Sequence, residues 1–336
     1  MENTNKKCDL KQCYVAIATP FYKTSSESRP KINYNSLDSI VFHIINNGIE
    51  GIVAAGSTGS GSALSYDQHV VLVKHVNDIF GKKAHVIAAD GSNITWEAIE
   101  LAKRIEGEAG VFTHLSAYGY YTKPSDAGIE KHFETLANNI DGQIILYSIP
   151  GRASGLTPEI VKNLAQHPKI IGLKNCPEDL EDTKRKIALT RNTNFKIFAG
   201  NDEDAVETIY AGGHGLISTA GNIEPRGIAL MVDCALKGEI DGARFFNNKF
   251  KELFSALFPK PIIGKYASPN PVMCHYALNK MGFAVGDSAV QLDNGNGLEK
   301  EAMDKALEKI GLIKNYKSLA DEVCGSSDGP CEGESI

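Results

Sequence analysis

The side chain with the most distinctive chemistry in this chain is a lysine at the end of an apolar segment. Lys174 follows Ile170-Ile171-Gly172-Leu173, a short run typical of a buried strand. An amine there could condense with a ketone to form an imine if its surroundings favour the neutral form, because a free ammonium with a pKa of about 10.4 is no nucleophile at neutral pH. A lysine that merely caps a strand and extends to water is the competing interpretation. The residues around Lys174 distinguish an imine-forming lysine from a strand-capping one.

A second reactive side chain ends the preceding strand-like run. Tyr147 follows Gln143-Ile144-Ile145-Leu146. If the two runs are parallel neighbours, Tyr147 and Lys174 reach the same rim, where a phenol can carry protons for an amine nucleophile. Cys176 lies two residues beyond Lys174, and we interpret it as a small buried apolar residue and not as the nucleophile.

Composition excludes several classes of function. The chain has 336 residues, a net charge of -6 and no block rich in Lys and Arg, which argues against nucleic acid and anionic membranes as partners. No apolar stretch approaches the roughly 18 residues of a spanning helix, and residues 1–12 lack the apolar core of a signal peptide. Seven scattered cysteines favour reduced thiols over disulfides or a zinc site. We therefore expect a soluble, cytoplasmic protein.

Short apolar runs alternate with helical patterns along most of the chain. This alternation is typical of repeated β-α units around a parallel sheet. The runs begin near Tyr14–Ile17, Gly51–Ala54, His85–Ala88, Gly110–Thr113, Gln143–Leu146, Ile170–Leu173, Phe195–Phe198 and Gly215–Ser218. Eight such units predict an α/β fold of the (β/α)8 barrel class.

Local signals support the barrel. Ser65-Tyr66-Asp67-Gln68 is a capping box, and Thr157-Pro158 places a cap before a proline in the first helical turn. A doubly wound open sheet is the competing architecture, but no Gly-x-Gly-x-x-Gly follows the first strand. Three more helical patterns, from about Arg226 to Phe258, Pro271 to Met281 and Leu298 to Ile310, predict a C-terminal helical subdomain.

These patterns divide the chain into four parts. We expect a disordered extension over residues 1–12, the barrel over 13–237, the helical subdomain over 238–318 and a disordered polar tail over 319–336. In such a barrel the site lies at the carboxyl ends of the strands. Candidates follow strand two at Gly56-Ser57-Thr58-Gly59-Ser60 and strand four at 118–124. The glycine-bracketed turn suits a carboxylate, whereas a phosphate-binding loop would need Gly-Lys-Ser/Thr.

Together these segments resemble the dihydrodipicolinate synthase and N-acetylneuraminate lyase family of class I aldolases, from about Tyr14 to Leu312. The resemblance implies that Lys174 forms an imine with pyruvate and that Tyr147 donates and accepts protons. It further implies that no cofactor and no metal take part. His114 and His214 are isolated in the sequence, and we expect them to be structural histidines.

The resemblance assigns further roles around the rim. It implies that Ser57 joins Tyr147 to Tyr121 in a proton relay completed across a subunit interface. Thr58 would hold the pyruvate carboxylate, and the backbone around Ile217 would help to shape the pocket. The family pattern also implies a homotetramer.

The loop after Tyr147 points to the second substrate. Pro150-Gly151-Arg152, Tyr120–Pro124 and Ser268-Pro269-Asn270-Pro271-Val272 resemble the synthase pattern, in which the arginine binds the carboxylate of aspartate semialdehyde. The implied reaction is condensation of pyruvate with L-aspartate 4-semialdehyde to 4-hydroxy-tetrahydrodipicolinate, in lysine biosynthesis. The alternatives are a lyase for N-acetylneuraminate or keto-sugar acids, and a catalytically impaired barrel that binds small carboxylates.

Two features qualify the resemblance. Ser57 stands where synthases usually have threonine, and Ser60 stands where they have a glutamate. Our hypothesis is that Ser60 alters local packing without abolishing imine formation. A large gain in turnover in Ser60→Glu would disprove it.

Some synthases are inhibited by lysine in a cleft between subunits. The matching residues here are His69, Asn93, Glu97 and Tyr120. The alternative is that these residues only pack an interface.

Overall fold

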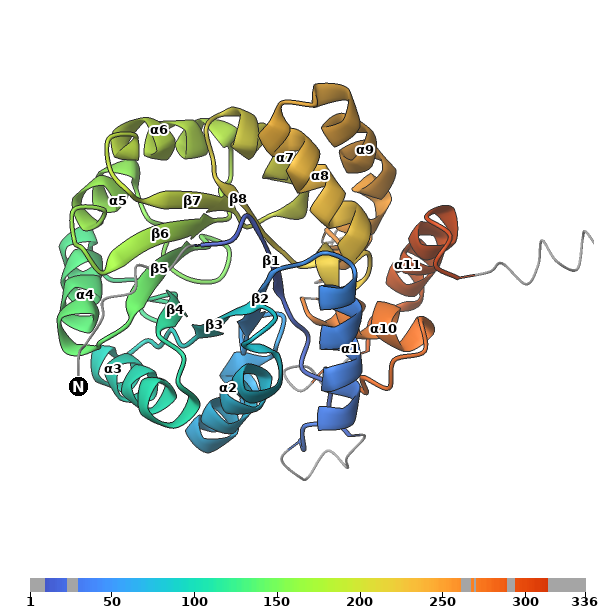
Figure 1. Cartoon of the computed structure of the whole chain (residues 1–336), viewed down its shortest axis with the longest axis horizontal. Coiled ribbons are helices and arrows are strands. Elements are labelled where there is room, and N and C mark those ends of the chain that lie inside the picture. Colours follow the sequence, from blue (N-terminus) through green and yellow to red (C-terminus); the bar gives the residue numbers. More distant parts are fainter. Residues whose placement is uncertain (1–9, 23–29, 261–266, 269, 289–293, 314–336) are drawn as a thin grey trace, which may run out of the picture.

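Eight parallel strands close into a barrel in the computed structural model, which describes residues 10–22, 30–260, 267–268, 270–288 and 294–313 (Figure 1). Neighbours in sequence are neighbours in space, and β1 also pairs with β8. The strands are β1 (Cys13–Ala16), β2 (Gly51–Ala54), β3 (His85–Ala89), β4 (Thr113–Ser116), β5 (Gln143–Ser148), β6 (Ile170–Asn175), β7 (Lys196–Ala199) and β8 (Gly215–Ser218). The predicted (β/α)8 barrel is confirmed.

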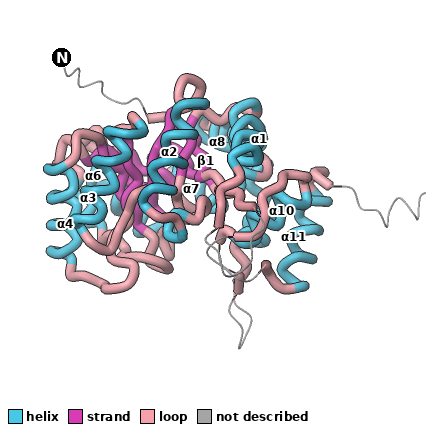
Figure 2. Tube along the Cα trace, turned by 90° about the horizontal axis from the view of Figure 1, so that it is seen from below, coloured by secondary structure: helices cyan, strands magenta, loops and turns pink. Residues whose placement is uncertain are grey.

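Helices surround the barrel and continue beyond it at the C-terminal end of the chain (Figures 1 and 2). The surrounding helices are α1 (Tyr34–Asn46), α2 (Tyr66–Phe80), α3 (Thr95–Arg104), α4 (Asp126–Asn139), α5 (Pro158–Leu164), α6 (Leu180–Thr190), α7 (Ala205–Tyr210) and α8 (Pro225–Lys237). After them come α9 (Ile240–Leu257), α10 (Val272–Lys280) and α11 (Gly297–Lys309). The boundary that we expected between residues 237 and 238 falls between α8 and α9, and the division into two units stays a prediction.

Two element boundaries differ from the sequence expectation, and a glycine in the left-handed region explains each. The pattern from Arg226 to Phe258 is two helices, because Gly238 (φ 75°) ends α8 before α9 begins. The fourth strand begins at Thr113 and not near Gly110. Gly110 (φ 66°) instead ends a π-helical turn, η2 (Ile105–Ala109).

The predicted helix starts are confirmed. The Ser65 side chain accepts a hydrogen bond from the Gln68 backbone, and the Gln68 side chain accepts one from the Ser65 backbone, so the capping box of α2 is complete. The Thr157 side chain caps α5, in which Pro158 occupies the first turn. These caps fix where α2 and α5 begin, after the loops that follow β2 and β5.

Apolar side chains fill the interior of the barrel. They are Tyr14, Ala16, Val53, Ile87, Leu115, Ile145, Phe198 and Ile217, with Leu10, Ala89, Tyr147 and Ile171 partly buried against them. Gly51 makes room for this filling, since a Cβ there would lie 2.1 Å from the Tyr14 ring. The filled interior closes the barrel below the rim, so the carboxyl ends of the strands are left for chemistry.

Some of the residues discussed from the sequence lie outside the part of the chain that the structure describes. Residues 1–9 of the predicted N-terminal extension and the whole of the predicted tail lie outside the described residues, as do Cys8, Cys324, Cys331 and Pro269. The cysteines that the structure describes, Cys13, Cys176, Cys234 and Cys274, are all free thiols.

A buried charged cluster joins β3, β4 and the π-helical turn. The His114 Nδ1 lies 2.5 Å from Asp90 Oδ2, and its Nε2 lies 3.2 Å from Glu106 Oε1. Glu106 also accepts hydrogen bonds from the backbone of Asp141 and Gly142. Burial alone would lower the pKa of His114, but Asp90 and Glu106 outweigh it and raise the pKa to about 9. His114 is therefore a structural imidazolium, held between two carboxylates.

This cluster predicts how stability depends on pH. A folded-state pKa near 9, against about 6.5 when unfolded, means that the stabilisation is complete below about pH 6.5 and is lost as pH rises through 9. The loss amounts to about 3 kcal/mol. We expect the free energy of urea unfolding to fall across this window in the wild-type protein and to change much less in His114→Gln.

His214 supplies the matched control for this experiment, because burial and Lys196 lower its pKa. His214→Gln should keep the wild-type pH profile between pH 6.5 and 9. Equal slopes in the wild-type protein and in His114→Gln would contradict a charged His114 in the folded state.

Candidate active site

A cavity of about 330 Å³ opens at the carboxyl ends of the strands. Its walls come from the segments after β2, β5, β6, β7 and β8 and from the C-terminal part of the chain. The lining residues are Ala16, Val53, Gly56, Ser57, Thr58, Leu115, Tyr147, Ile149, Pro150, Gly151, Arg152, Lys174, Cys176, Pro177, Glu178, Gly200, Asn201, Thr219, Phe258 and Asn270. Five of the predicted site residues thus share one cavity.

Lys174 lies in the wall of this cavity near its apolar floor. Lys174 on β6 pairs in register with Tyr147 on β5, and the Lys174 Nζ lies 4.7 Å from the centroid of the Tyr147 ring. The lysine is only 5% exposed. Burial lowers the pKa of Lys174, and the Arg152 charge lowers it further, against the opposing influence of Cys176 and Asp202. The site therefore favours the neutral amine, as an imine-forming lysine requires.

Tyr147 presents its hydroxyl to the polar groups beside Lys174. Its Oη lies 4.0 Å from Cys176 Sγ, and Ser57 also hydrogen-bonds it. Burial raises the pKa of Tyr147 well above its ordinary value. The phenol is therefore protonated at neutral pH and can donate a proton to a reacting group. Burial also raises the pKa of Cys176, so its thiol is not the activated nucleophile.

A chain of hydroxyl and amide groups forms another wall. Asn270 Nδ2 donates to Thr58 Oγ1 over 3.0 Å, and Thr58 Oγ1 lies 3.4 Å from Thr219 Oγ1. Thr58 is held in a loop that also carries Ser57 and ends at Ser60, a residue in the left-handed region (φ 55°). Fixed donors of this kind can bind a small carboxylate beside the amine.

Arg152 stands at the exposed mouth of the cavity. Its Nη1 donates to the backbone oxygen of Asn270 over 3.4 Å. That contact leaves most of the guanidinium free for a ligand, because Arg has five N–H donors in a planar fork. The arrangement suits a second carboxylate at the entrance.

Buried Asp202 positions the segment that follows β8. It accepts hydrogen bonds from Ser218 Oγ and from the backbone of Thr219 and Ala220. Burial raises the pKa of Asp202, whereas these hydrogen bonds lower it. The carboxyl group thereby fixes the segment after β8 that brings Thr219 into the cavity.

Two of the seven residues predicted for catalysis or substrate binding do not line the cavity. Tyr121 is 88% exposed, and its backbone N–H donates to Asn93 Oδ1. Ile217 is buried in the barrel interior among the apolar side chains of the other strands. Sequence reasoning missed Thr219 and Asn270 as wall residues. The rule that found Lys174 would have found Thr219, which directly follows β8, whereas only the resemblance drew attention to the segment around Asn270.

The residues matched to a lysine site lie in α2 (His69), in α3 (Glu97) and in the loops after β3 (Asn93) and β4 (Tyr120). Asn93 Oδ1 accepts from the Tyr120 backbone over 2.9 Å, and Glu97 Oε2 accepts from Ser92 Oγ over 2.8 Å. Burial and Glu97 raise the pKa of the adjacent Tyr66 to about 12. His69 is buried, and burial lowers its pKa. Glu97 and Tyr120 both lie near Tyr66, whereas His69 is buried in α2.

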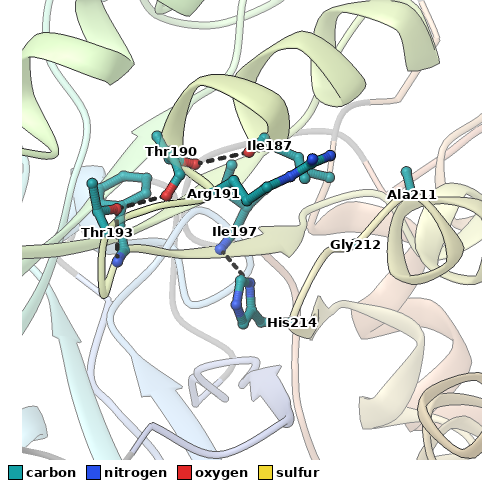
Figure 3. A pocket seen from close by; sticks show the side chains of 9 residues that line it. Ile187, Thr190, Arg191, Thr193, Ile197, Ala211, Gly212 and His214 are labelled. Atoms are coloured by element: carbon teal, nitrogen blue, oxygen red, sulfur yellow. Dashed lines mark hydrogen bonds between the residues drawn. The ribbon is translucent and has the colours of Figure 1, made fainter.

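A second cavity, of about 210 Å³, lies at the opposite end of the barrel (Figure 3). It is formed by the end of α6, the start of β7 and the segment before β8. The His214 ring in it points to the backbone of Ile197, whose N–H donates to His214 Nδ1 over 3.1 Å (Figure 3). Thr190 and Thr193 donate to backbone oxygens. These groups serve the structure, and no lysine or tyrosine lines this cavity.

Other kinds of site are absent from the described part of the chain. Within the residues that the structure describes, no group of three or more His, Cys, Asp and Glu side chains could hold a metal ion. No described helix is both long and apolar enough to cross a membrane.

Comparison with known proteins gives a consistent family. The Dihydrodipicolinate synthetase family matches residues 9–300. A 4-hydroxy-tetrahydrodipicolinate synthase from Pseudoalteromonas atlantica is 37% identical over 80% of this chain and 87% of its own. The structure of the chloride-inhibited dihydrodipicolinate synthase from Acinetobacter baumannii complexed with pyruvate is 30% identical, with a TM-score of 0.83, and the match covers 91% of this chain and 100% of that one. A lysine-bound synthase structure from Cyanidioschyzon merolae is 29% identical, with a TM-score of 0.81, and covers 90% and 98% of the two chains.

Proposed function

The chain belongs to the dihydrodipicolinate synthetase family, and we propose that it condenses pyruvate with L-aspartate 4-semialdehyde to give 4-hydroxy-tetrahydrodipicolinate. The observation that carries the proposal is the buried Lys174 amine beside the Tyr147 ring in a cavity lined by Thr58 and Arg152. The relatives named above as synthases support the choice of reaction.

The first half of the reaction makes a carbon nucleophile. Neutral Lys174 attacks the ketone of pyruvate, water leaves, and an imine forms whose protonated nitrogen acts as the electron sink. Thr58 holds the pyruvate carboxylate. Loss of a methyl proton then gives an enamine, and Tyr147 carries the protons in these steps.

The second half joins the two substrates. Arg152 binds the carboxylate of aspartate semialdehyde. The enamine carbon attacks the aldehyde of this substrate, and the aldehyde oxygen takes up a proton to become the hydroxyl group. The amine of this substrate then attacks the imine carbon, and the bond to the Lys174 nitrogen breaks. Ring closure therefore releases the product and returns the free lysine.

The proton relay requires a second copy of the chain. Tyr121 does not line the cavity of its own subunit and is exposed. Its neighbour Tyr120 is also exposed, as is Trp96 at the start of α3, just after Asn93, which accepts the Tyr121 backbone N–H. We propose that this surface meets another subunit of a homotetramer, so that Tyr121 of one copy completes the relay from Ser57 of the other. Sedimentation velocity would detect the assembly, and an active monomer would contradict it.

A coupled assay tests the proposed reaction. We expect turnover with pyruvate and aspartate semialdehyde, measured through a reductase that consumes the product, and no cleavage of N-acetylneuraminate. The guanidinium of Arg152 favours this outcome, because it suits a carboxylate better than the polyhydroxyl chain of a sugar acid. Cleavage of N-acetylneuraminate without condensation would overturn the proposal.

We also propose feedback inhibition by lysine at the edge formed by His69, Asn93, Glu97 and Tyr120. The carboxylate of Glu97 would pair with an ammonium of lysine. We expect Glu97→Gln to weaken lysine inhibition about tenfold or more without changing KM for pyruvate, since a charge-assisted hydrogen bond is worth about 1.5–3 kcal/mol. Inhibition kinetics measure the effect, with Glu301→Gln on α11 as the control. An unchanged inhibition constant in Glu97→Gln would contradict the site.

A further inference from the structure

One carboxylate lines the active-site cavity, and the mechanism above does not use it. Glu178 is the sole acidic residue in the cavity wall that the structure describes. Its side chain is exposed and makes no hydrogen bond or ion pair with the described residues. It follows Lys174, Cys176 and Pro177 along the same wall. An unpaired charge at the mouth of a substrate cavity is available to a ligand.

The backbone around Glu178 is held in place on both sides. Pro177 precedes it and fixes its own φ angle. Asp179 follows as the N-cap of α6, and its side chain accepts from the Asp182 backbone over 2.8 Å. The segment that carries the carboxylate is therefore held on both sides, and Glu178 lines the same cavity as Arg152.

The charges of the cavity can be matched with those of the substrates. The cationic or basic groups in the wall are Lys174 and Arg152. Lys174 becomes the imine, and Arg152 takes the carboxylate of the second substrate. That substrate also carries an ammonium group on the carbon next to its carboxylate, and this cation needs an acceptor close to Arg152. Asn201 and Asn270 offer neutral amide oxygens, whereas Glu178 offers a negative charge, which makes the stronger bond.

We propose that Glu178 binds the ammonium group of the second substrate, an inference that rests on the proposed function. Glu178 would thereby select an amino aldehyde over an aldehyde without an amine. Arg152 and Glu178 then form a charge pair for a zwitterion at the mouth of the cavity. Because Glu178 is exposed, the bound ammonium can lose its proton to water before the amine attacks the imine.

Comparison of two aldehydes tests this inference. Aspartate semialdehyde and succinate semialdehyde differ by the amine alone. We expect Glu178→Gln to lower kcat/KM for aspartate semialdehyde by about tenfold to a hundredfold. Succinate semialdehyde should be affected less than about twofold, measured as pyruvate consumption or, if it is not consumed, as its inhibition constant against aspartate semialdehyde.

Glu203→Gln is the matched control, because it removes an exposed carboxylate after β7 that does not line the cavity. It should leave both aldehydes unaffected. Equal losses for the two aldehydes in Glu178→Gln, or no loss for either, would overturn the role of Glu178. If wild-type protein forms the pyruvate imine but does not consume aspartate semialdehyde, the proposed function itself fails, and that result is separate from the comparison of variants.

Discussion

Replacement of Lys174 by alanine will abolish imine formation with pyruvate and lower condensation at least about a thousandfold. The reason is that no other amine lines the cavity among the described residues; the one remaining cation there is the guanidinium of Arg152, which does not deprotonate. Turnover in the coupled assay and trapping of pyruvate with borohydride measure the two effects separately.

The control for this experiment is Cys176→Ala. Burial raises the pKa of the Cys176 thiol, so this residue is not expected to react with pyruvate. The Cys176→Ala protein should still trap pyruvate at Lys174. Trapping that persists in Lys174→Ala, or that disappears in Cys176→Ala, would contradict the assignment of the nucleophile.

Tyr147→Phe will lower kcat by about a hundredfold to ten-thousandfold, the range for loss of a proton-transfer group. The change keeps the ring that lies 4.7 Å from the Lys174 amine and removes the hydroxyl that contacts Cys176 and Ser57. Packing should survive, so the unfolding midpoint should change little while steady-state turnover falls. Imine trapping should become slower but still reach completion.

Tyr118→Phe is the matched control for the loss of a hydroxyl. Tyr118 stacks on His132 with ring centroids 3.7 Å apart and does not line the cavity. Its variant should keep near wild-type turnover. If Tyr147→Phe were as active as Tyr118→Phe, Tyr147 would have no part in proton transfer.

The sequence alone was sufficient to predict the pairing of Tyr147 with Lys174. Each residue follows an apolar run, and parallel neighbours bring the ends of such runs to one rim, where the two residues are in register. The same rule found the turn with Ser57 and Thr58. Strand boundaries were less predictable, since a left-handed glycine at 110 delays β4 and another at 238 divides α8 from α9.

Other parts of the site depend on contacts between distant segments. Asn270 reaches Thr58 from the C-terminal part of the chain, and no local pattern predicts that hydrogen bond. The charged state of His114 likewise depends on Asp90 and Glu106, which approach it only in the folded barrel. Tyr121 is exposed in the single chain, and its place in a relay across a subunit interface stays a prediction.

The most direct test of the central claim is to incubate the wild-type protein with pyruvate, reduce it with borohydride, and map the adduct by peptide mass spectrometry. We expect a single reduced adduct on Lys174, the buried amine with a lowered pKa in the cavity wall. An unmodified protein, or an adduct on any other residue, would contradict it.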